Sequence, residues 1–315
     1  MSQFRKLGSL EVSTVGVGCN NFGSRLDQGA TQRVVDAALE AGLNFFDTAD
    51  IYGGTRSEEY LGRALGPRRS QVLIATKFGL PLDDERKGAR PEYIRRAVED
   101  SLRRLDTDYI DLYQLHRPDP EVPIADTLGA LDQLVRTGKV RALGCSNFNV
   151  EQLNASAEAA HRGSLAPFVS VQNEFSLLKR DDEQTVLPAA ERAGLAYLPY
   201  FPLASGLLSG KYRSGEPTPE GTRLTAPASG LRDRFLKPEH LAIAAKLEDY
   251  ARAHGHSLLE LAFSWLLSHR AVASVIAGAS TAAQVKANAA AANWQLSADA
   301  RGAIDAIARL PVVDR

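Results

Sequence analysis

Four residues of this chain, taken together, could transfer a proton to a carbonyl group: Asp47, Tyr52, Lys77 and His116. Asp47 and Tyr52 lie in GLNFFDTADIYG, Lys77 lies in VLIATKFG, and His116 lies in YIDLYQLHRPD. Each sequence opens with a short apolar run that is typical of a buried strand. A phenol, an ammonium, a carboxylate and an imidazole at neighbouring strand ends indicate carbonyl reduction, provided that another part of the chain binds a hydride donor.

The four side chains divide this chemistry between them. A free tyrosine has a pKa of roughly 10, which is too high for an efficient proton donor near neutrality. A buried Lys77 would stabilise the phenolate and lower that pKa, and Asp47 would keep Lys77 charged. His116 would donate a hydrogen bond to the carbonyl oxygen. The alternative is that Asp47 and Lys77 form a structural ion pair and that His116 caps a turn.

Eight apolar runs alternate with amphipathic stretches along the chain. Strands that are apolar on both faces and alternate with helices predict a parallel sheet covered by helices. The runs are Val15–Gly18, Leu43–Asp47, Val72–Lys77, Tyr109–Leu115, Val140–Cys145, Phe168–Gln172, Leu195–Pro199 and Val272–Ile276.

The count of eight favours a closed (β/α)8 barrel over an open nucleotide-binding sheet. The first run contains Gly16 and Gly18, and the next glycine is Gly23, which is the wrong spacing for G-x-G-x-x-G. The stretch from Gly206 to Lys211 approaches a phosphate-binding loop but continues with Tyr212. A TIM barrel also explains why Asp47, Lys77 and His116 stand at the carboxyl ends of strands, where barrel enzymes place their sites.

Local signals predict how the barrel is bounded and covered. The segment Phe4–Val12 is expected to form a hairpin that closes the barrel floor. Pro91 suits the first turn of a helix, and Thr55 followed by Glu58 predicts a capping box. The segment from Ser205 to about Pro238 is rich in Gly, Pro, Ser and Arg, and its place after the seventh strand favours a long loop that covers a ligand.

Composition excludes several classes of protein. The chain has 315 residues, 44% hydrophobic and 24% charged, and a formal net charge of −1, so nothing favours binding to nucleic acid or to an anionic membrane. Two cysteines and the absence of an apolar leader or spanning segment favour the reducing cytoplasm. No internal linker is visible, so a single domain over residues 1–315 is expected.

Seven ordered blocks resemble the aldo-keto reductase superfamily over nearly the whole chain. They are GLNFFDTADIYGGTRSEEYLG, ATKFG, DLYQLHRPD, GKVRALGCSNF, VQNEFSLL, PYFPLASGLLSGKY and VIAGASTAAQVKAN. PLASGLLSGKY resembles the branch of bacterial reductases and potassium-channel β-subunits more than the aldose reductase branch. The resemblance implies a (β/α)8 barrel that binds a nicotinamide cofactor in extended form without a Rossmann domain.

The resemblance also implies which residues hold the cofactor. Ser146, Asn147 and Gln172 would bond the nicotinamide carboxamide, to which they offer suitable donors and acceptors. Tyr200 would stack under the nicotinamide ring, the alternative being an ordinary buried aromatic. The expected pyrophosphate contacts are Leu203, Ser205, Gly206, Leu207 and Lys211.

At the adenine end the chain departs from the family's common pattern. Many relatives carry Arg at the position of Gln284 and Glu at the position of Ala287. Without that guanidinium, NADPH remains the expected cofactor but NADH is possible, and Lys286 or Arg223 could compensate. The residues that match the adenine block are Gly278, Ser280, Thr281, Gln284 and Asn288.

Other candidate residues carry less weight. His254 and His256 form an H-x-H without a third ligand, so a surface pair is expected and no metal site. Several residues that follow strand ends are expected to line the substrate mouth by the geometry of the fold. They are Cys19, Asn20, Asn21, Phe22, Ile51, Phe78 and Arg117.

The sequence is compatible with two functions. The first is an NAD(P)H-dependent reductase of aldehydes and ketones, whose partner is a small-molecule carbonyl substrate. The alternative is a non-catalytic, cofactor-sensing regulatory subunit, as in the channel-associated relatives, which retain the four residues. Only a short segment precedes the first predicted barrel strand at Val15, which disfavours the alternative.

Overall fold

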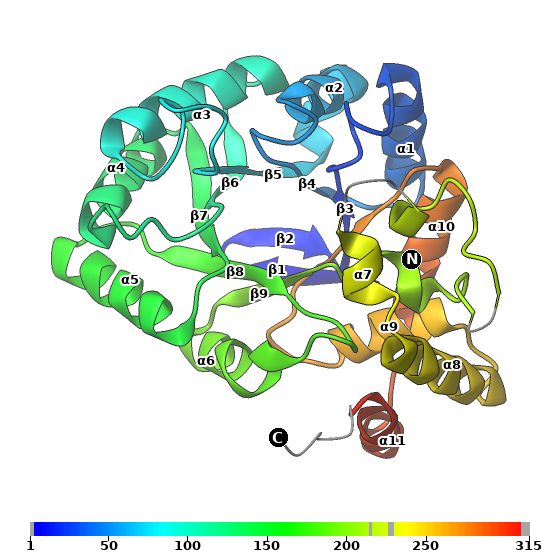
Figure 1. Ribbon diagram of the computed structural model, residues 1–315. Coiled ribbons are helices and arrows are strands. Elements are labelled where there is room, and N and C mark those ends of the chain that lie inside the picture. The colour runs from blue at the N-terminus through cyan, green and yellow to red at the C-terminus, as the bar shows by residue number, and fades with distance from the viewer. Residues whose placement is uncertain (1–2, 214–215, 226–229, 310–315) are drawn as a thin grey trace.

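In the computed structural model, eight parallel strands form a barrel around the molecular axis (Figure 1). The structure describes residues 3–213, 216–225 and 230–309. The strands follow the order β10-β3-β4-β5-β6-β7-β8-β9, and the chain just before β10 pairs with β9 through Tyr197 and Val272. Their bounds are β3 Val15–Gly18, β4 Phe45–Asp47, β5 Leu73–Phe78, β6 Ile110–Leu115, β7 Val140–Ser146, β8 Phe168–Glu174, β9 Ala196–Tyr200 and β10 Val275–Gly278.

The predicted (β/α)8 barrel is therefore confirmed, and each predicted apolar run overlaps one of its strands. The last run differs most, because strand β10 begins at Val275 whereas Val272 makes only an isolated bridge. None of the described helices is long and apolar enough to cross a membrane.

The predicted N-terminal hairpin is also confirmed. Strands β1 (Phe4–Leu7) and β2 (Leu10–Ser13) pair antiparallel, and the turn between them contains Gly8 at φ +58°. Leu7 and Leu10 are buried in the cluster that fills the barrel interior, together with Phe45 of β4. The hairpin thus closes the floor of the barrel, opposite the carboxyl ends of the strands.

Helices surround the barrel and cover its outer face (Figure 1). The prediction for Pro91 is confirmed, since it is the first residue of its helix. The α-helices are α1 Gln28–Glu40, α2 Arg56–Leu65, α3 Pro91–Leu105, α4 Ile124–Arg136, α5 Val150–Gly163, α6 Val186–Ala193, α7 Leu231–Phe235, α8 Pro238–Ala253, α9 Leu258–Leu267, α10 Ala282–Ala290 and α11 Ala298–Ala308. Short 3-10 helices are η1 Gly66–Gln71, η2 Asp181–Gln184, η3 Ala204–Ser209, η4 Arg223–Thr225 and η5 Ala291–Asn293.

The predicted capping box at the start of α2 is wrong. Thr55 has left-handed backbone geometry (φ +78°), and its side chain makes no capping hydrogen bond. Glu58 is fully buried, and its carboxylate accepts hydrogen bonds from Thr76 and from Arg104. A buried carboxylate paired with a guanidinium would be costly to leave unpaired, so this contact with α3 takes precedence over a cap.

The segment after β9 is less irregular than the sequence suggests. The predicted loop from Ser205 to Pro238 contains most of η3, all of η4 and the short helix α7, while residues 214–215 and 226–229 lie outside the described ranges. Helix α7 lies in front of the barrel in Figure 1, on the side of β3 and α10. The segment therefore lies at the carboxyl face, where the candidate site is.

A second buried carboxyl group lies behind the barrel mouth. Asp50 follows β4, its carboxylate accepts a hydrogen bond from the Tyr93 hydroxyl, and its Oδ1 has no partner in the described part of the chain. Burial and the nearby charge of Glu58 raise the pKa of Asp50 to about 7, against the opposing effect of Arg104. The folded protein therefore holds this proton more tightly than the unfolded chain, in which an aspartate has a pKa of about 3.9.

Asp50→Asn should make stability less dependent on pH. As pH rises from 5 to 8, the wild type should lose about 2 to 3 kcal/mol of unfolding free energy through Asp50, because only the folded state resists ionisation. The amide carries no ionisable proton, so the variant should not lose this contribution. Urea unfolding at several pH values measures the difference, with the exposed Asp84→Asn as control. A difference between variant and wild type that does not grow with pH would contradict the assignment.

Candidate active site

The ion pair of Asp47 and Lys77 lies at the carboxyl end of the barrel and is almost inaccessible to solvent. The Lys77 ammonium donates to Asp47 Oδ2 at 2.6 Å and to the carbonyl oxygen of Thr48 at 2.9 Å. Burial alone lowers the pKa of Lys77, but the charges and hydrogen bonds of Asp47 and Tyr52 outweigh it and leave that pKa raised. Lys77 is therefore held as a buried cation.

Two glutamine side chains fix the other oxygen of Asp47. Gln172 donates to Asp47 Oδ1 at 2.9 Å and Gln114 donates to the same atom at 3.2 Å. The sequence does not mark Gln114 as a site residue, because no local pattern distinguishes a functional glutamine inside an apolar strand run from a structural one. Its role follows from the barrel, which brings β4, β6 and β8 round one axis.

Tyr52 lies beside this ion pair and beside His116. Its ring centroid is 5.1 Å from the Lys77 nitrogen and 5.8 Å from the His116 ring, which it meets edge to face. Burial, with the nearby charge of Asp47, raises the pKa of Tyr52 above its ordinary value, against the opposing charge and hydrogen bond of Lys77. The expected downward effect of Lys77 is present, but burial and Asp47 together outweigh it.

His116 is a neutral imidazole. Burial, followed by the positive charges of Lys77 and Arg117, lowers the pKa of His116 to about 2. Its Nδ1 has no hydrogen-bond partner among the described residues. A neutral imidazole retains one N–H, which is the donor that a carbonyl oxygen beside Tyr52 would need.

The residues expected at the nicotinamide, Ser146, Asn147, Gln172 and Tyr200, form one network at the barrel mouth. Asn147 has left-handed backbone geometry, its amide donates to the His116 carbonyl oxygen at 3.0 Å, and its Oδ1 accepts from the Tyr200 hydroxyl at 2.8 Å. Ser146 donates to the main-chain oxygen of Gln172 at 2.7 Å. The structure thus links these four residues to one another and to the ion pair.

A cavity of about 420 Å³ extends from this group toward helix α10. At one end it is lined by Asp47 and Tyr52, and at the other by residues of β10 and α10. The residues expected at the cofactor that line it are Leu203, Ser205, Gly206, Lys211, Gly278, Ser280, Gln284 and Asn288.

Six residues expected at the cofactor do not line the cavity: the network of Ser146, Asn147, Gln172 and Tyr200 at the barrel mouth, and also Leu207 and Thr281. Leu207 is fully buried in the hydrophobic core. The Thr281 side chain accepts the main-chain N–H of Gln284 and so caps α10. The Gln284 side chain in turn accepts from the main-chain N–H and the hydroxyl of Ser280 at 2.8 and 2.9 Å.

The loop that follows β9 has a strained backbone along this cavity. Phe201, Ala204, Ser205 and Gly206 all have positive φ. A side chain at Gly206 would bring its Cβ within 3.0 Å of the Lys211 ammonium, so glycine lets the loop and the lysine approach each other. Such strain persists only where the surrounding structure imposes it, and it is common in ligand-binding loops.

Three cations line the cavity and have no ion pair with a described acid: Arg25, Lys211 and Arg223. Burial, and then the charge of Arg25, lower the pKa of Lys211 and of Arg223. Arg25 also donates to the carbonyl oxygen of Gly221 at 2.8 Å. Lys286, the other candidate for compensation, instead pairs with Glu40 at 3.2 Å on the outer surface. Unpaired cations that converge on one cavity are suited to a polyanionic ligand.

The candidate metal pair of His254 and His256 belongs to a different region. His256 stacks on Trp294 with ring centroids 4.0 Å apart, and its Nδ1 lies 3.2 Å from Glu260. His254 packs against the Tyr250 ring and contacts the Tyr250 carbonyl oxygen. Both rings therefore pack at the ends of α8 and α9.

Comparison with known proteins identifies the family. The model of the Aldo/keto reductase family matches residues 14–309. The chain is 34% identical to "Aldo-keto reductase YhdN" of Bacillus subtilis, over 97% of this chain and 92% of that protein. It is 33% identical to "Probable voltage-gated potassium channel subunit beta" of Arabidopsis thaliana, over 91% of this chain and 90% of that protein. It is 36% identical to "Uncharacterized oxidoreductase YrpG" of Bacillus subtilis, over 88% of this chain and 86% of that protein. The chain therefore belongs to the aldo/keto reductase family of oxidoreductases.

Proposed function

We propose that this protein is an NADPH-dependent reductase of aldehydes and ketones in which Tyr52 donates the proton. The observation that carries the proposal is the buried group of Asp47, Lys77, Tyr52 and His116 at the end of a cavity with unpaired cations. NADH remains a possible cofactor, since the proposal for NADPH rests on the adenine end.

The residues along the cavity fit a dinucleotide. Its two phosphate-bearing parts need positive charge, which Arg25, Lys211 and Arg223 supply without forming an ion pair to any acid in the described ranges. Gly206 lets the main chain come close to the ligand. When bound, the nicotinamide would supply the hydride that carbonyl reduction requires.

In the proposed reaction Tyr52 gives its hydroxyl proton to the carbonyl oxygen as the oxygen gains negative charge. Lys77 stabilises the resulting phenolate, and Asp47 keeps Lys77 charged. The neutral His116 donates a hydrogen bond that orients the carbonyl. The edge-to-face contact of Tyr52 with His116 supports a shared oxygen position between the two donors.

The nicotinamide end would be held by the network of Ser146, Asn147, Gln172 and Tyr200. Asn147 and Tyr200 bond each other, so a primary amide would exchange one polar partner for another at little cost. The Tyr200 ring meets Phe201 edge to face at 5.5 Å, which leaves a ring face for stacking.

The alternative function is a cofactor-sensing subunit, which the likeness to a potassium channel subunit keeps in consideration. Turnover separates the two functions. The purified protein with NADPH and a panel of aldehydes should oxidise the cofactor steadily, as followed by its near-ultraviolet absorbance, and should not do so without aldehyde. Tight NADPH binding without turnover on any aldehyde would favour the sensing subunit.

Gln284→Arg should tighten NADPH selectively, if the 2′-phosphate lies at the start of α10. A charge-assisted contact with phosphate is worth about 1.5 to 3 kcal/mol, roughly tenfold or more in Kd. Fluorescence titration at low and high salt should show a salt-dependent gain for NADPH but not for NADH, because an exposed ion pair is screened.

Gln284→Met is the matched control, since it also removes the hydrogen bonds to Ser280 but adds no charge. Equal gains for both cofactors in Gln284→Arg would mean that the arginine stacks on adenine. No gain for either cofactor would place the phosphate elsewhere.

A further inference from the structure

Arg117 is a cation next to the proposed catalytic group that the proposed reaction does not use. It follows His116 directly, in the loop between β6 and α4, and its side chain is exposed. Within the described ranges it takes part in no ion pair, hydrogen bond or ring contact. A guanidinium at this position is therefore available to a ligand.

The charge of Arg117 acts on both sides of the barrel mouth. It contributes to the lowered pKa of His116, after burial and Lys77, and it opposes the rise in the pKa of Tyr200 that burial and Glu174 cause. His116 follows β6 and Tyr200 ends β9, so the charge reaches across the mouth. Arg234, which also acts on Tyr200, differs because it is paired with Glu174.

Arg117 also lines a cavity of about 590 Å³ whose other walls are mainly apolar. Asn147 lies at the edge of this cavity and bonds both the His116 carbonyl oxygen and the Tyr200 hydroxyl, so the cavity adjoins the candidate active site. The apolar wall is formed by Leu115, Pro118, Val122, Ile124, Phe148 and Ala155.

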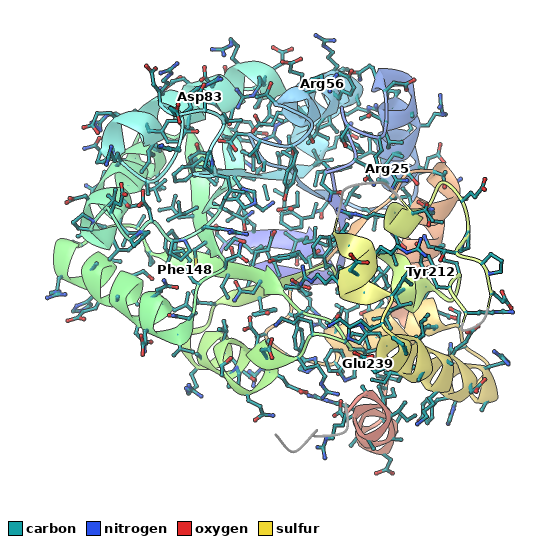
Figure 2. All side chains as sticks on the ribbon, viewed as in Figure 1. Arg25, Arg56, Asp83, Phe148, Tyr212 and Glu239 are labelled. Atoms are coloured by element: carbon teal, nitrogen blue, oxygen red, sulfur yellow. The ribbon has the colours of Figure 1, made fainter. Side chains whose placement is uncertain are left out.

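The acidic residue in this cavity, Asp119, forms no ion pair with Arg117. The oxygens of Asp119 accept main-chain N–H groups of Ala89 at 2.8 Å and of Glu121 at 3.0 Å, which ties the carboxylate to the loop backbone. The cofactor phosphates would not reach Arg117 either. Arg25 of the cofactor cavity and Phe148 of this cavity lie on opposite sides of the barrel mouth (Figure 2).

We infer that Arg117 binds the carboxylate of acidic carbonyl substrates, and that the apolar wall takes their carbon skeleton. The substrate class is oxo-carboxylic acids with an apolar body between the carbonyl and the carboxylate. The inference rests on the proposed function, because the carbonyl of such a substrate would meet Tyr52 and His116. Its carboxylate would then extend over the mouth to an unpaired guanidinium, which binds carboxylates in bidentate geometry.

Two aldehydes of equal shape test the inference: 4-carboxybenzaldehyde and its neutral analogue 4-formylbenzamide. The wild type should prefer the acid. Arg117→Gln should lower kcat/KM for the acid by about tenfold or more, mainly through KM, and should change kcat/KM for the amide by less than about twofold. Arg117→Lys should restore part of the preference, because lysine keeps the positive charge but lacks the planar guanidinium that binds a carboxylate through two hydrogen bonds.

Arg95→Gln is the matched control, because Arg95 is an exposed arginine on α3 without an ion pair among the described residues. It makes the same change in net charge and should leave the preference unchanged. Loss of the preference in both variants would mean that net charge, not Arg117, attracts the acid, and would overturn the inference.

Binding without turnover separates this inference from the proposed function. Calorimetry should show that 4-(hydroxymethyl)benzoate binds the wild type about tenfold or more tightly than Arg117→Gln, whereas 4-(hydroxymethyl)benzamide should not distinguish them. If the neutral aldehyde is reduced but neither assay depends on Arg117, the inference is overturned and the proposed function stands. If neither of these aldehydes is reduced, the acidic substrate class is overturned, whereas the proposed function fails only if no aldehyde of the panel is reduced.

Discussion

Tyr52→Phe should lower the rate of carbonyl reduction at least about a hundredfold, the lower range of general acid catalysis. The substitution removes only the hydroxyl, so the ring should keep its edge-to-face contact with His116 and its position near the Lys77 ammonium. Binding of NADPH should survive, because the cations proposed to bind its phosphates are unchanged. The measurement is kcat for one aldehyde that the wild type reduces, together with the Kd of NADPH by protein fluorescence.

Tyr60→Phe provides the control for the loss of a phenol. Tyr60 lies on α2, and its hydroxyl makes no hydrogen bond within the described part of the chain. The Tyr60→Phe variant should reduce aldehydes at the wild-type rate. Turnover near the wild-type rate in Tyr52→Phe would rule out Tyr52 as the proton donor. Equal loss of turnover and of NADPH binding would mean instead that the site had collapsed.

Lys77→Met should shift the pH dependence of alcohol oxidation to higher pH. In that direction Tyr52 must be a phenolate that accepts the alcohol proton. Lys77 lowers the pKa of Tyr52, so its removal should raise that pKa further above the ordinary value. At a given pH a smaller fraction of the enzyme then carries the phenolate. Oxidation rates measured across a pH series show the shift, and the buffers should hold ionic strength constant.

Lys77→Arg is the control that keeps a cation in this position, and its profile should shift less than that of Lys77→Met. A Lys77→Met profile that matches the wild type after scaling would make Lys77 a structural residue rather than an electrostatic one. Asp47→Asn should give a smaller shift and should also destabilise the fold by about 3 to 5 kcal/mol, because it removes one partner of a buried ion pair. Urea unfolding measures this cost.

Much of the barrel follows from local patterns. Runs that are apolar on both faces can only be covered by helices, so eight of them alternating with amphipathic stretches predict the parallel sheet that β3 to β10 form. The polar residues at the ends of those runs are predictable for the same reason. All strands of a barrel end on one face, so Asp47 and Lys77, 30 positions apart, meet there.

Local patterns fail where a distant partner competes with a nearby one. Thr55 and Glu58 have the spacing of a capping box, but Glu58 pairs with Arg104, 46 positions away, because a buried charge needs an opposite charge more than a helix end needs a cap. Leu207 lies among residues expected at the cofactor, yet the turn of η3 directs it into the core.

The electrostatics of the site depend wholly on the tertiary structure. The sequence alone determined the barrel and the residue types that meet at its mouth. It did not determine that Arg25 and Gly221, 196 positions apart, would be joined by a hydrogen bond at the cavity, or that Arg117 would form no ion pair with any residue that the structure describes. It also did not determine that burial and Asp47 together outweigh Lys77 at Tyr52, or that burial holds His116 neutral. Charge balance and desolvation depend on every group that packs around a side chain, and those groups come from segments that no local pattern relates.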